Sequence, residues 1–299
     1  MLRYIILASI FLRLTACTGV FFYPSEKPGA FPINVGLEFD EVLFDGEEGE
    51  LYGWWLPTQY ADSMAESRQP KGTIIFAHGN AGNVSSHLAF VYWLPKLGYN
   101  LFMFDYRGYG HSEGKPTAMG IVDDTQRAIR YVQGREEVNT GIVLYGHSLG
   151  GATGLSALAD LENRTGIRGA IIDSSFASYR SIARQKVASH WMTAVFYPLV
   201  PLLITGKPVP EQLVTKLAPL PVYISHSPAD KVIPIKQGRR LFEHALAPKQ
   251  FYSLKTQQHN HGWQNKEDRQ WFMATLEQLF LTNTVEPIDA AAEEAMLAR

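Results

Sequence analysis

The sequence is poor in the residues that disulfide-bonded proteins and most metal enzymes need. It has 299 residues but one cysteine, Cys17, so no disulfide can form within the chain and no cysteine cluster can hold a metal. Nine histidines are scattered along the chain, and the zinc-protease pattern H-E-x-x-H does not occur. We therefore expect no metal and no cofactor in the chemistry of this protein.

Charge of one sign is also scarce. The formal net charge is −2 and no basic cluster interrupts the sequence, which argues against a nucleic-acid partner. There is no Walker-type phosphate loop and no internal repeat. With 46% hydrophobic residues, the chain has enough apolar side chains for the core of one large domain.

Long hydrophobic runs are missing. Residues 4–12 are apolar and follow Arg3, but this run is too short to span a bilayer and is typical of a secretory signal. Residues 14–17, LTAC, resemble the bacterial lipobox, in which the cysteine becomes lipidated. We predict a signal peptide over 1–17, a lipid anchor on Cys17, and a membrane-anchored lipoprotein of the cell envelope. In a Gram-negative cell it would lie on the outer membrane or the periplasmic face.

The body of the chain alternates short apolar strands with helices. This rhythm predicts a mostly parallel sheet with helices on both faces. A hairpin signal comes first, and a helix is expected from the residues after 83 to about 97. The domain limits that we expect are an irregular tether at 18–36, a body at 37–282 and a tail at 283–299. The predicted strands are 37–43, 51–56, 73–77, 100–104, 142–145, 169–173, 221–225 and 250–254.

The strand–helix rhythm breaks over residues 176–216, which we interpret as a short lid insertion. Within it, residues 188–204 are apolar and aromatic. That composition fits a lid that lines an acyl pocket, and equally helices packed on the core. Because ligands of such sheets bind at the carboxyl ends of the strands, the loops that follow the strands should carry the functional residues.

The pentapeptide GHSLG at 146–150 follows a predicted strand and precedes a run of small residues at helical spacing. This context predicts a nucleophile elbow with Ser148 at its apex. The same G-x-S-x-G pattern recurs at 110–114, but there Lys115-Pro116 follows and no helix can begin at once. We predict that Ser112 lies in a solvated loop.

Acid and base candidates follow later strands. Asp230 lies in the turn-rich segment SPADKVIP, and Asp173, at the end of the strand after the Ser148 strand, is the rival acid. We favour Asp230 and expect Asp173 to bond backbone groups in its own turn. His259 and His261 compete for the role of base, and spacing alone does not separate them. Ser148, Asp230 and a histidine then follow the chain order of a hydrolase triad.

Two backbone N–H groups are expected to form the oxyanion hole. Leu149, directly after the nucleophile, supplies one. Asn80, in the loop after strand 73–77, is predicted to supply the other. His78 and His226 also flank the expected cleft, and we expect them to brace loops.

Together these motifs, with HGN at 78–80 and DYRGYG at 105–110, resemble the α/β-hydrolase superfamily of serine hydrolases. The likeness runs from about residue 37 to 281 and is to the compact α/β-hydrolase domain-containing proteins, which include depalmitoylases, lysophospholipases and acylglycerol lipases. It implies an α/β-hydrolase fold and a bracing role for loop 105–110. In this family the base is commonly followed by Asn, two residues and Trp, which points to His259 over His261.

The resulting expectation is a serine hydrolase that cleaves an ester or thioester of a small-molecule or lipid substrate at the membrane. An amidase or peptidase with the same triad is the alternative within enzymes. The alternative that is not an enzyme is a non-catalytic envelope protein that binds a partner or lipid. Members of the superfamily that have lost catalysis usually lack one of the triad residues.

Overall fold

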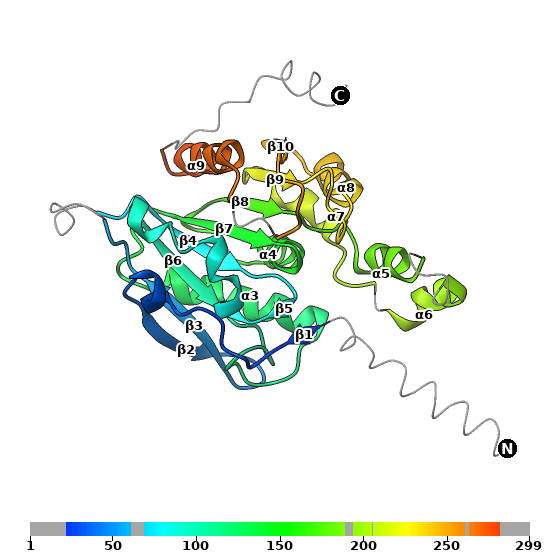
Figure 1. Ribbon diagram of the computed structural model, residues 1–299, viewed down its shortest axis with the longest axis horizontal. Helices are drawn as coiled ribbons and strands as arrows, with labels where there is room; N and C mark the ends of the chain where they lie inside the picture. The colour runs from blue at the N-terminus through cyan, green and yellow to red at the C-terminus, as the bar shows by residue number, and fades with distance from the viewer. Residues whose placement is uncertain (1–21, 61–68, 189–193, 205, 261–262, 282–299) are drawn as a thin grey trace.

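A twisted sheet organises the computed structural model, which describes residues 22–60, 69–188, 194–204, 206–260 and 263–281. Eight strands follow the order β10-β9-β8-β7-β4-β6-β3-β2 (Figure 1). Their bounds are β2 Asp40–Asp45, β3 Glu50–Leu56, β4 Gly72–Ala77, β6 Tyr99–Phe104, β7 Ile142–His147, β8 Ile167–Asp173, β9 Val222–His226 and β10 Lys249–Ser253. The predicted signal peptide 1–17, with Cys17, and the tail 283–299 lie outside the described residues.

The sheet is mostly parallel, as predicted. Strands β2 and β3 form an antiparallel hairpin, and β3 joins β6 antiparallel. All pairs from β6 through β4, β7, β8 and β9 to β10 are parallel. Parallel pairing brings the carboxyl ends of β4, β7, β8 and β9 to one edge, and the loops that carry the predicted site residues begin there.

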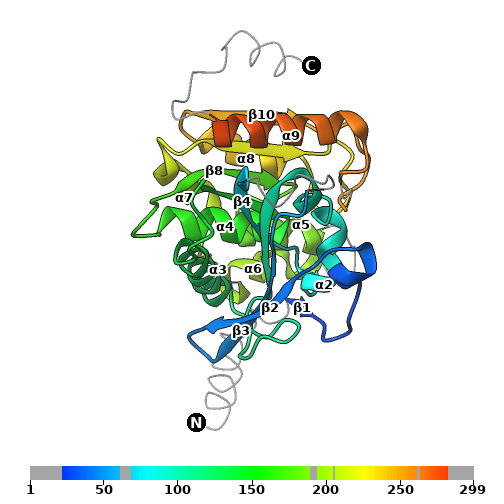
Figure 2. The same cartoon turned by 90° about the vertical axis from the view of Figure 1, so that its left-hand side faces the viewer.

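The central strands β4, β6 and β7 are buried on both faces, and neighbouring residues of a strand point to opposite faces. In β4, Ile75 and Ala77 belong to one apolar cluster, and Ile74 and Phe76 belong to the other. Helices α3 (Ala118–Gln133), α4 (Leu149–Ala159) and α8 (Lys236–His244) contribute to the first cluster. Helix α9 (Lys266–Leu281) covers the opposite face together with residues 84–94 (Figure 2).

The helix expected up to residue 97 is the main secondary-structure error. The segment instead contains α2 (Val84–His87) and two short 3₁₀ turns, η4 (Leu88–Phe90) and η5 (Pro95–Leu97). Serine, β-branched and aromatic residues are weak helix formers, and Pro95 cannot donate a backbone hydrogen bond. Leu88, Val91 and Leu94 are fully buried, so packing against the sheet determines the path of this segment.

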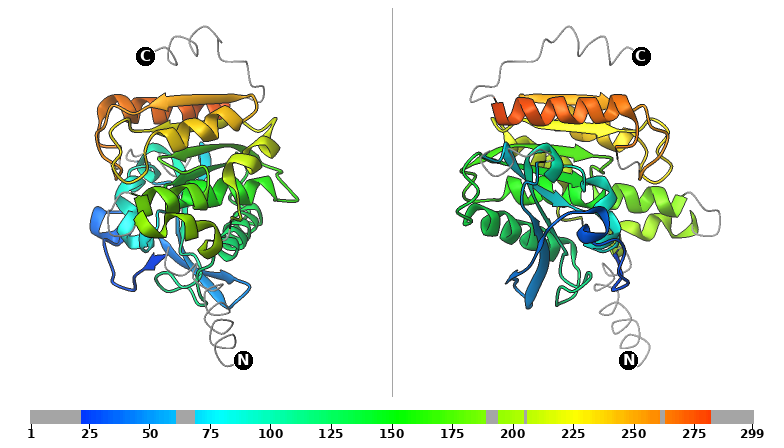
Figure 3. Two further views of the ribbon diagram at one scale, coloured as in Figure 1. Left: turned by 90° about the vertical axis from the view of Figure 1, so that its right-hand side faces the viewer. Right: turned by 60° about the vertical axis from the view of Figure 1, so that its left-hand side comes forward.

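The insertion 176–216 stands beside the carboxyl edge of the sheet. Its described elements are α5 (Tyr179–Ala188), η6 (Ala194–Leu199), α6 (Val200–Leu203), α7 (Pro210–Leu213) and η7 (Val214–Leu217). Helices α5 and α6 project from the body (Figure 1 and Figure 3). No helix within the described ranges is long and apolar enough to cross a membrane.

The segment expected to be a tether packs on the body over its described part, residues 22–36. It is mostly irregular, with strand β1 (Tyr23–Pro24) and the turn η2 (Pro32–Val35). Strand β1 pairs in parallel with β5 (Ala81–Gly82), which follows β4. Phe22 is buried in the main apolar cluster, so this segment is part of the folded body and not a free connector.

Candidate active site

Ser148 stands at the turn between β7 and α4, as the strand–turn–helix pattern predicts. Its backbone has φ 55° and ψ −114°, a conformation that is strained for a residue with a side chain. Its own N–H donates to the carbonyl of Asp173 (2.8 Å). A Cβ at position 150 would overlap the carbonyl oxygen of Ala77, so only glycine lets α4 begin this close to β4.

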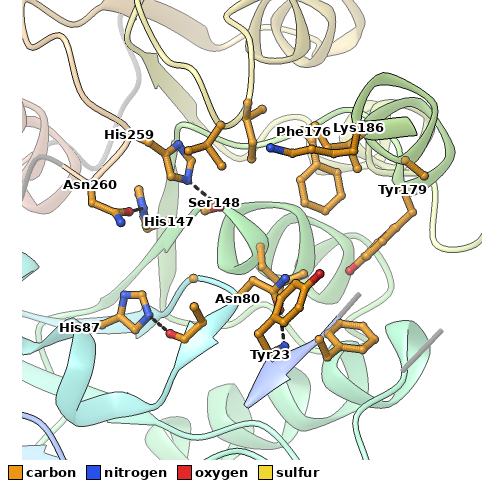
Figure 4. Close-up of a pocket in the computed structure, with 18 of the residues that line it drawn as sticks. Tyr23, Asn80, His87, His147, Ser148, Phe176, Tyr179, Lys186, His259 and Asn260 are labelled. Atoms are coloured by element: carbon orange, nitrogen blue, oxygen red, sulfur yellow. Dashed lines mark hydrogen bonds between the residues drawn. The ribbon is translucent and has the colours of Figure 1, made fainter. Parts of the chain in front are cut away.

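The side chains of Ser148, His259 and Asp230 form a continuous hydrogen-bonded chain. His259 Nε2 lies 3.0 Å from Ser148 Oγ (Figure 4). On the other side of the ring, His259 Nδ1 lies 2.6 Å from Asp230 Oδ2. The loops after β7, β9 and β10 supply the three residues. His261 lies outside the described residues, so the structure places one of the two competing histidines and it contacts the serine.

Asp230 is held in its ionised form by its surroundings. Burial by itself would raise the pKa of this carboxyl, but hydrogen bonds from His226 and His259 outweigh burial and hold the pKa well below its usual range. Oδ1 accepts the N–H groups of Val232 (2.7 Å) and Ile233 (2.9 Å), which fixes the carboxylate in its loop. The anion can therefore orient the His259 ring and stabilise its protonated form.

The side chain of Asp173, the rival acid, binds a different set of partners. Its buried carboxylate accepts hydrogen bonds from His147 Nδ1 (2.9 Å) and from the hydroxyls of Ser225 (2.9 Å) and Ser174 (3.1 Å). These three partners are side chains, whereas the sequence led us to expect backbone groups of its own turn. The structure brings Asp230 and not Asp173 to the ring nitrogen of His259.

The HGN loop lies directly beside the nucleophile. A Cβ at Gly79 would stand 3.7 Å from the Ser148 Cβ, and both Gly79 and Asn80 line the same cavity as Ser148. Leu149 begins α4, so its N–H belongs to the first, unpaired turn of the helix. The backbone groups predicted to bind an oxyanion thus flank the serine from two elements.

The loop DYRGYG at 105–110 braces the site through hydrogen bonds to the HGN loop, as the family likeness implies. The Tyr106 hydroxyl donates to the carbonyl of His78 (2.9 Å), and the Tyr109 hydroxyl donates to Asn80 Oδ1 (2.8 Å). Arg107 is buried and pairs with Asp124 at 2.8 Å, away from the cavity. His78 and His226 also bond loop carbonyls, those of Gly79 and Ile233, at 2.7 Å.

A cavity of about 750 Å³ opens over Ser148 (Figure 4). Its lining is mostly apolar and aromatic, and Lys186 of α5 is the one lysine or arginine among the lining residues of the described chain. Burial lowers the pKa of His87 to about 3, and His78 acts in the same direction, so the His87 ring in this wall is uncharged. The apolar lining includes Phe22, Leu149, Phe176, Tyr179, Ile182, Ala183, Val187, Val232 and Ile233.

The sequence left two interpretations open for the insertion, a lid that lines an acyl pocket and helices packed on the core. The cavity lining bears on this choice. Ile182 and Ala183 of α5 face the cavity, and Tyr179 does so as well (Figure 4). In the same insertion, Tyr197 and Leu199 of η6 are 45% and 42% exposed. The insertion therefore forms a wall of the cavity through α5 and also presents apolar side chains to the outside.

Two contributions to the site were missed in the sequence. His147, inside the GHSLG motif, bonds Asp173 and lies 3.3 Å through Nε2 from Asn260 Oδ1. In the sequence, the position of His147 directly before Ser148 was the signal that could have indicated this contribution. Phe22 and Tyr23 line the cavity from the N-terminal segment, and nothing in the proline-rich sequence around them indicates that role.

Ser112 is buried and is not among the lining residues, which corrects its prediction as a solvated residue.

No cluster of three or more potential metal ligands occurs within the described part of the chain. The polar groups that face the cavity include those of Ser148, His147, His259, Asn260 and Asn80, with Lys186 at the α5 side. A hydroxyl beside an imidazole, flanked by backbone N–H groups, is a set suited to nucleophilic attack on a carbonyl.

Comparison with known proteins gives a consistent picture. The family described as serine aminopeptidase, S33, matches residues 68–216. The uncharacterized protein YfhR of Salmonella typhimurium is 37% identical over 258 residues, which cover 83% of this chain and 82% of YfhR. The lysophosphatidylserine lipase ABHD12 of Macaca fascicularis is 29% identical over 221 residues, covering 68% of this chain and 54% of that protein.

Solved structures agree in fold. The Pyrococcus furiosus esterase Pf2001 superposes with a TM-score of 0.67 at 19% identity, over 86% of this chain and 97% of the esterase. The α/β-hydrolase GrgF from Penicillium superposes with a TM-score of 0.63 at 18% identity, over 82% of this chain and 99% of that one. The predicted fold class is confirmed.

Proposed function

Because the chain belongs to the α/β-hydrolase family, we propose that it is a serine hydrolase that cleaves carboxylic ester or thioester bonds with Ser148, His259 and Asp230. Membership of the family supports hydrolase activity, and the geometry supports the finer assignment. The observation that carries the proposal is the unbroken contact from Ser148 Oγ through His259 to the Asp230 carboxylate.

The reaction follows from this arrangement. Ser148 Oγ attacks the carbonyl carbon of the substrate while His259 Nε2 takes the hydroxyl proton. The carbonyl oxygen becomes an anion, and the N–H groups of Leu149 and Asn80 stabilise it. His259 then gives the proton to the leaving alcohol or thiol, which leaves an acyl group on Ser148. Water, activated by the same imidazole, attacks the acyl-enzyme and regenerates the serine.

The cavity favours a substrate with an apolar acyl group. Most of the lining is aliphatic or aromatic, and burial of an apolar chain there contributes about 25 cal/mol per Å². The relative ABHD12 is named a lysophosphatidylserine lipase, and the likeness to it supports a lipid ester as substrate. We propose a single-chain lipid ester or an acyl thioester as the physiological class.

We also propose that the protein acts at a membrane of the cell envelope, held by an acylated Cys17. The lipobox-like LTAC supports this, and Phe22, which lines the cavity, follows Cys17 by five residues. Five residues of chain span at most about 18 Å. An anchor on Cys17 would therefore hold the cavity near the bilayer surface.

Metabolic labelling with an alkyne fatty acid tests the anchor. We expect incorporation into the full chain and none into Cys17→Ala. Label that persists in Cys17→Ala, or a wild type without label, would rule the anchor out without affecting the proposed chemistry.

A peptidase is the second candidate, because the matching family is described as serine aminopeptidase. Kinetics on two substrate series separate the candidates. We expect turnover of p-nitrophenyl acetate, butyrate, octanoate and palmitate, with kcat/KM rising with acyl length. Aminoacyl p-nitroanilides should react far more slowly. A preference for the anilides would assign the site to a peptidase, and a wild type that hydrolyses neither series would refute the proposed function.

A further inference from the structure

The N-terminal strap, defined as residues 22–29, is bonded to the loop that carries Asn80. The Tyr23 N–H donates to Asn80 Oδ1 (3.2 Å), and the Ser25 N–H donates to the carbonyl of Gly82 (3.0 Å). Strands β1 and β5 pair in parallel here, with Tyr23 opposite Ala81 and Pro24 opposite Gly82. The contact links segments that lie almost sixty positions apart in the sequence.

The contact continues past β5 to the start of α2. Asn83 Nδ2 donates to the carbonyls of Ser25 (2.7 Å) and Lys27 (3.0 Å). The Gly29 N–H donates to Ser85 Oγ (2.6 Å). Asn83 also caps α2, because its Oδ1 accepts the N–H of Ser85 (3.0 Å). The strap therefore covers the whole stretch from residue 80 to residue 85.

Asn80 is held from two sides. Its carboxamide oxygen has two lone pairs. One accepts the Tyr23 N–H of the strap, and the other accepts the Tyr109 hydroxyl of the bracing loop (2.8 Å). Gly79 has no side chain to pack and Gly82 has φ 86°, so glycine allows this loop more backbone conformations than other residues would. Hydrogen bonds from other segments restrict that freedom.

We propose that the N-terminal strap is a positioning element of the active site. Its Tyr23 N–H, together with the Tyr109 hydroxyl, fixes the Asn80 side chain and thereby aims the Asn80 backbone N–H at the oxyanion. This inference rests on the proposed function, since it needs the reaction at Ser148. Phe22 and Tyr23 also form part of the cavity wall, so the strap shapes both the pocket and its oxyanion donor (Figure 4).

A matched pair of variants in the full chain tests the strap. Tyr23→Pro removes the donating N–H, whereas Tyr23→Ala removes the ring and keeps that N–H. Relative to Tyr23→Ala, we expect Tyr23→Pro to lower kcat about tenfold and to weaken a trifluoromethyl ketone inhibitor by the same factor. KM should match in the two variants, because an oxyanion donor acts in the transition state. Tyr109→Phe should change kcat in the same direction.

Amide hydrogen exchange gives a readout that does not depend on activity. Exchange at residues 80–85 should be faster in Tyr23→Pro than in Tyr23→Ala. Equal exchange in the pair would overturn the proposal, and so would faster exchange with an equal kcat and equal inhibitor affinity. A wild type that hydrolyses no ester would refute the proposed function, and the exchange comparison would still decide whether the strap holds the loop.

Discussion

The pattern G-x-S-x-G occurs twice, and its two serines have opposite surroundings. Ser148 lies where β7 ends and α4 begins, with φ 55° and its hydroxyl 3.0 Å from His259. Ser112 lies in a loop after β6, where its hydroxyl donates to the carbonyl of Asp105 (2.8 Å). The same oxygen accepts the N–H of Tyr52 at 2.9 Å. Both serines are 7% exposed, so burial does not distinguish them.

The difference lies in what each hydroxyl faces. The Ser112 hydroxyl is used by two backbone groups, the carbonyl of Asp105 in its own loop and the N–H of Tyr52 in β3. The Ser148 hydroxyl faces an imidazole and a cavity of about 750 Å³. A serine acts as a nucleophile when a base lies beside it and substrate can reach it. The pentapeptide G-x-S-x-G by itself provides neither of these. The predictions below test this contrast and the triad on which it depends.

Ser148→Ala should have the largest effect. Without the attacking oxygen, kcat for ester hydrolysis should fall by about 10⁴-fold or more. The free energy of unfolding should stay within about 1 kcal/mol of the wild type, because Ser148 Oγ contacts a side chain that can bond water instead. Steady-state kinetics and thermal unfolding measure both. A variant that retains turnover would show that another residue is the nucleophile.

His259→Ala should cost about 10³-fold or more in kcat, because the variant lacks the proton acceptor. His261→Ala is the matched control from the same loop and should keep kcat within about threefold of the wild type. Kinetics of the two variants at neutral pH separate the histidines. The reverse result would assign the base to His261.

Asp230→Asn should lower kcat by about 10²- to 10⁴-fold, because an amide no longer fixes the tautomer of His259. Asp173→Asn is the control and should have a smaller effect. Equal losses in the two variants would remove the distinction between the acids.

The same variant has a signature in stability against pH. Burial raises the pKa of Asp230, but hydrogen bonds from His226 and His259 hold it well below its usual range. Such a carboxyl contributes stability above its unfolded pKa, about 3.9, and loses that contribution as the pH falls through the folded pKa. From about pH 4 downward, the wild type should lose more stability than Asp230→Asn. Unfolding in urea at several pH values measures the difference.

Ser112→Ala should have the smallest effect on activity. Its loss leaves the Tyr52 N–H without its hydroxyl partner, which should destabilise the fold by about 1–3 kcal/mol. Its kcat should stay near the wild-type value. Urea unfolding and ester kinetics check the two expectations, and a variant with wild-type stability and reduced kcat would contradict the structural role.

Sequence reasoning identified the elements whose signals are local. The β7–Ser148–α4 unit is one example, because strand, turn and helix are consecutive in the chain. The choice of Asp230 over Asp173 also agrees with the contacts in the structure. The existence and the mostly parallel direction of the strands followed from the alternation of strands with helices.

The rest depended on long-range packing. The segment after Asn83 does not form the one continuous helix expected up to residue 97, because its buried side chains pack on the sheet. The role of residues 22–29 depends on pairing with β5, and a two-residue strand has no periodicity to detect. The His147–Asp173 contact joins neighbouring strands, and the burial of Ser112 results from its pairing with Tyr52. No pattern within a single segment encodes such partners.

Labelling with a fluorophosphonate, followed by mapping of the modified peptide, tests the central claim most directly. The probe forms a covalent bond with an activated serine, and both G-x-S-x-G serines are present in one molecule. We predict one adduct per chain, on Ser148, which is absent from Ser148→Ala and His259→Ala and unchanged in Ser112→Ala. An adduct on Ser112, or a folded wild type that does not react, would contradict the account.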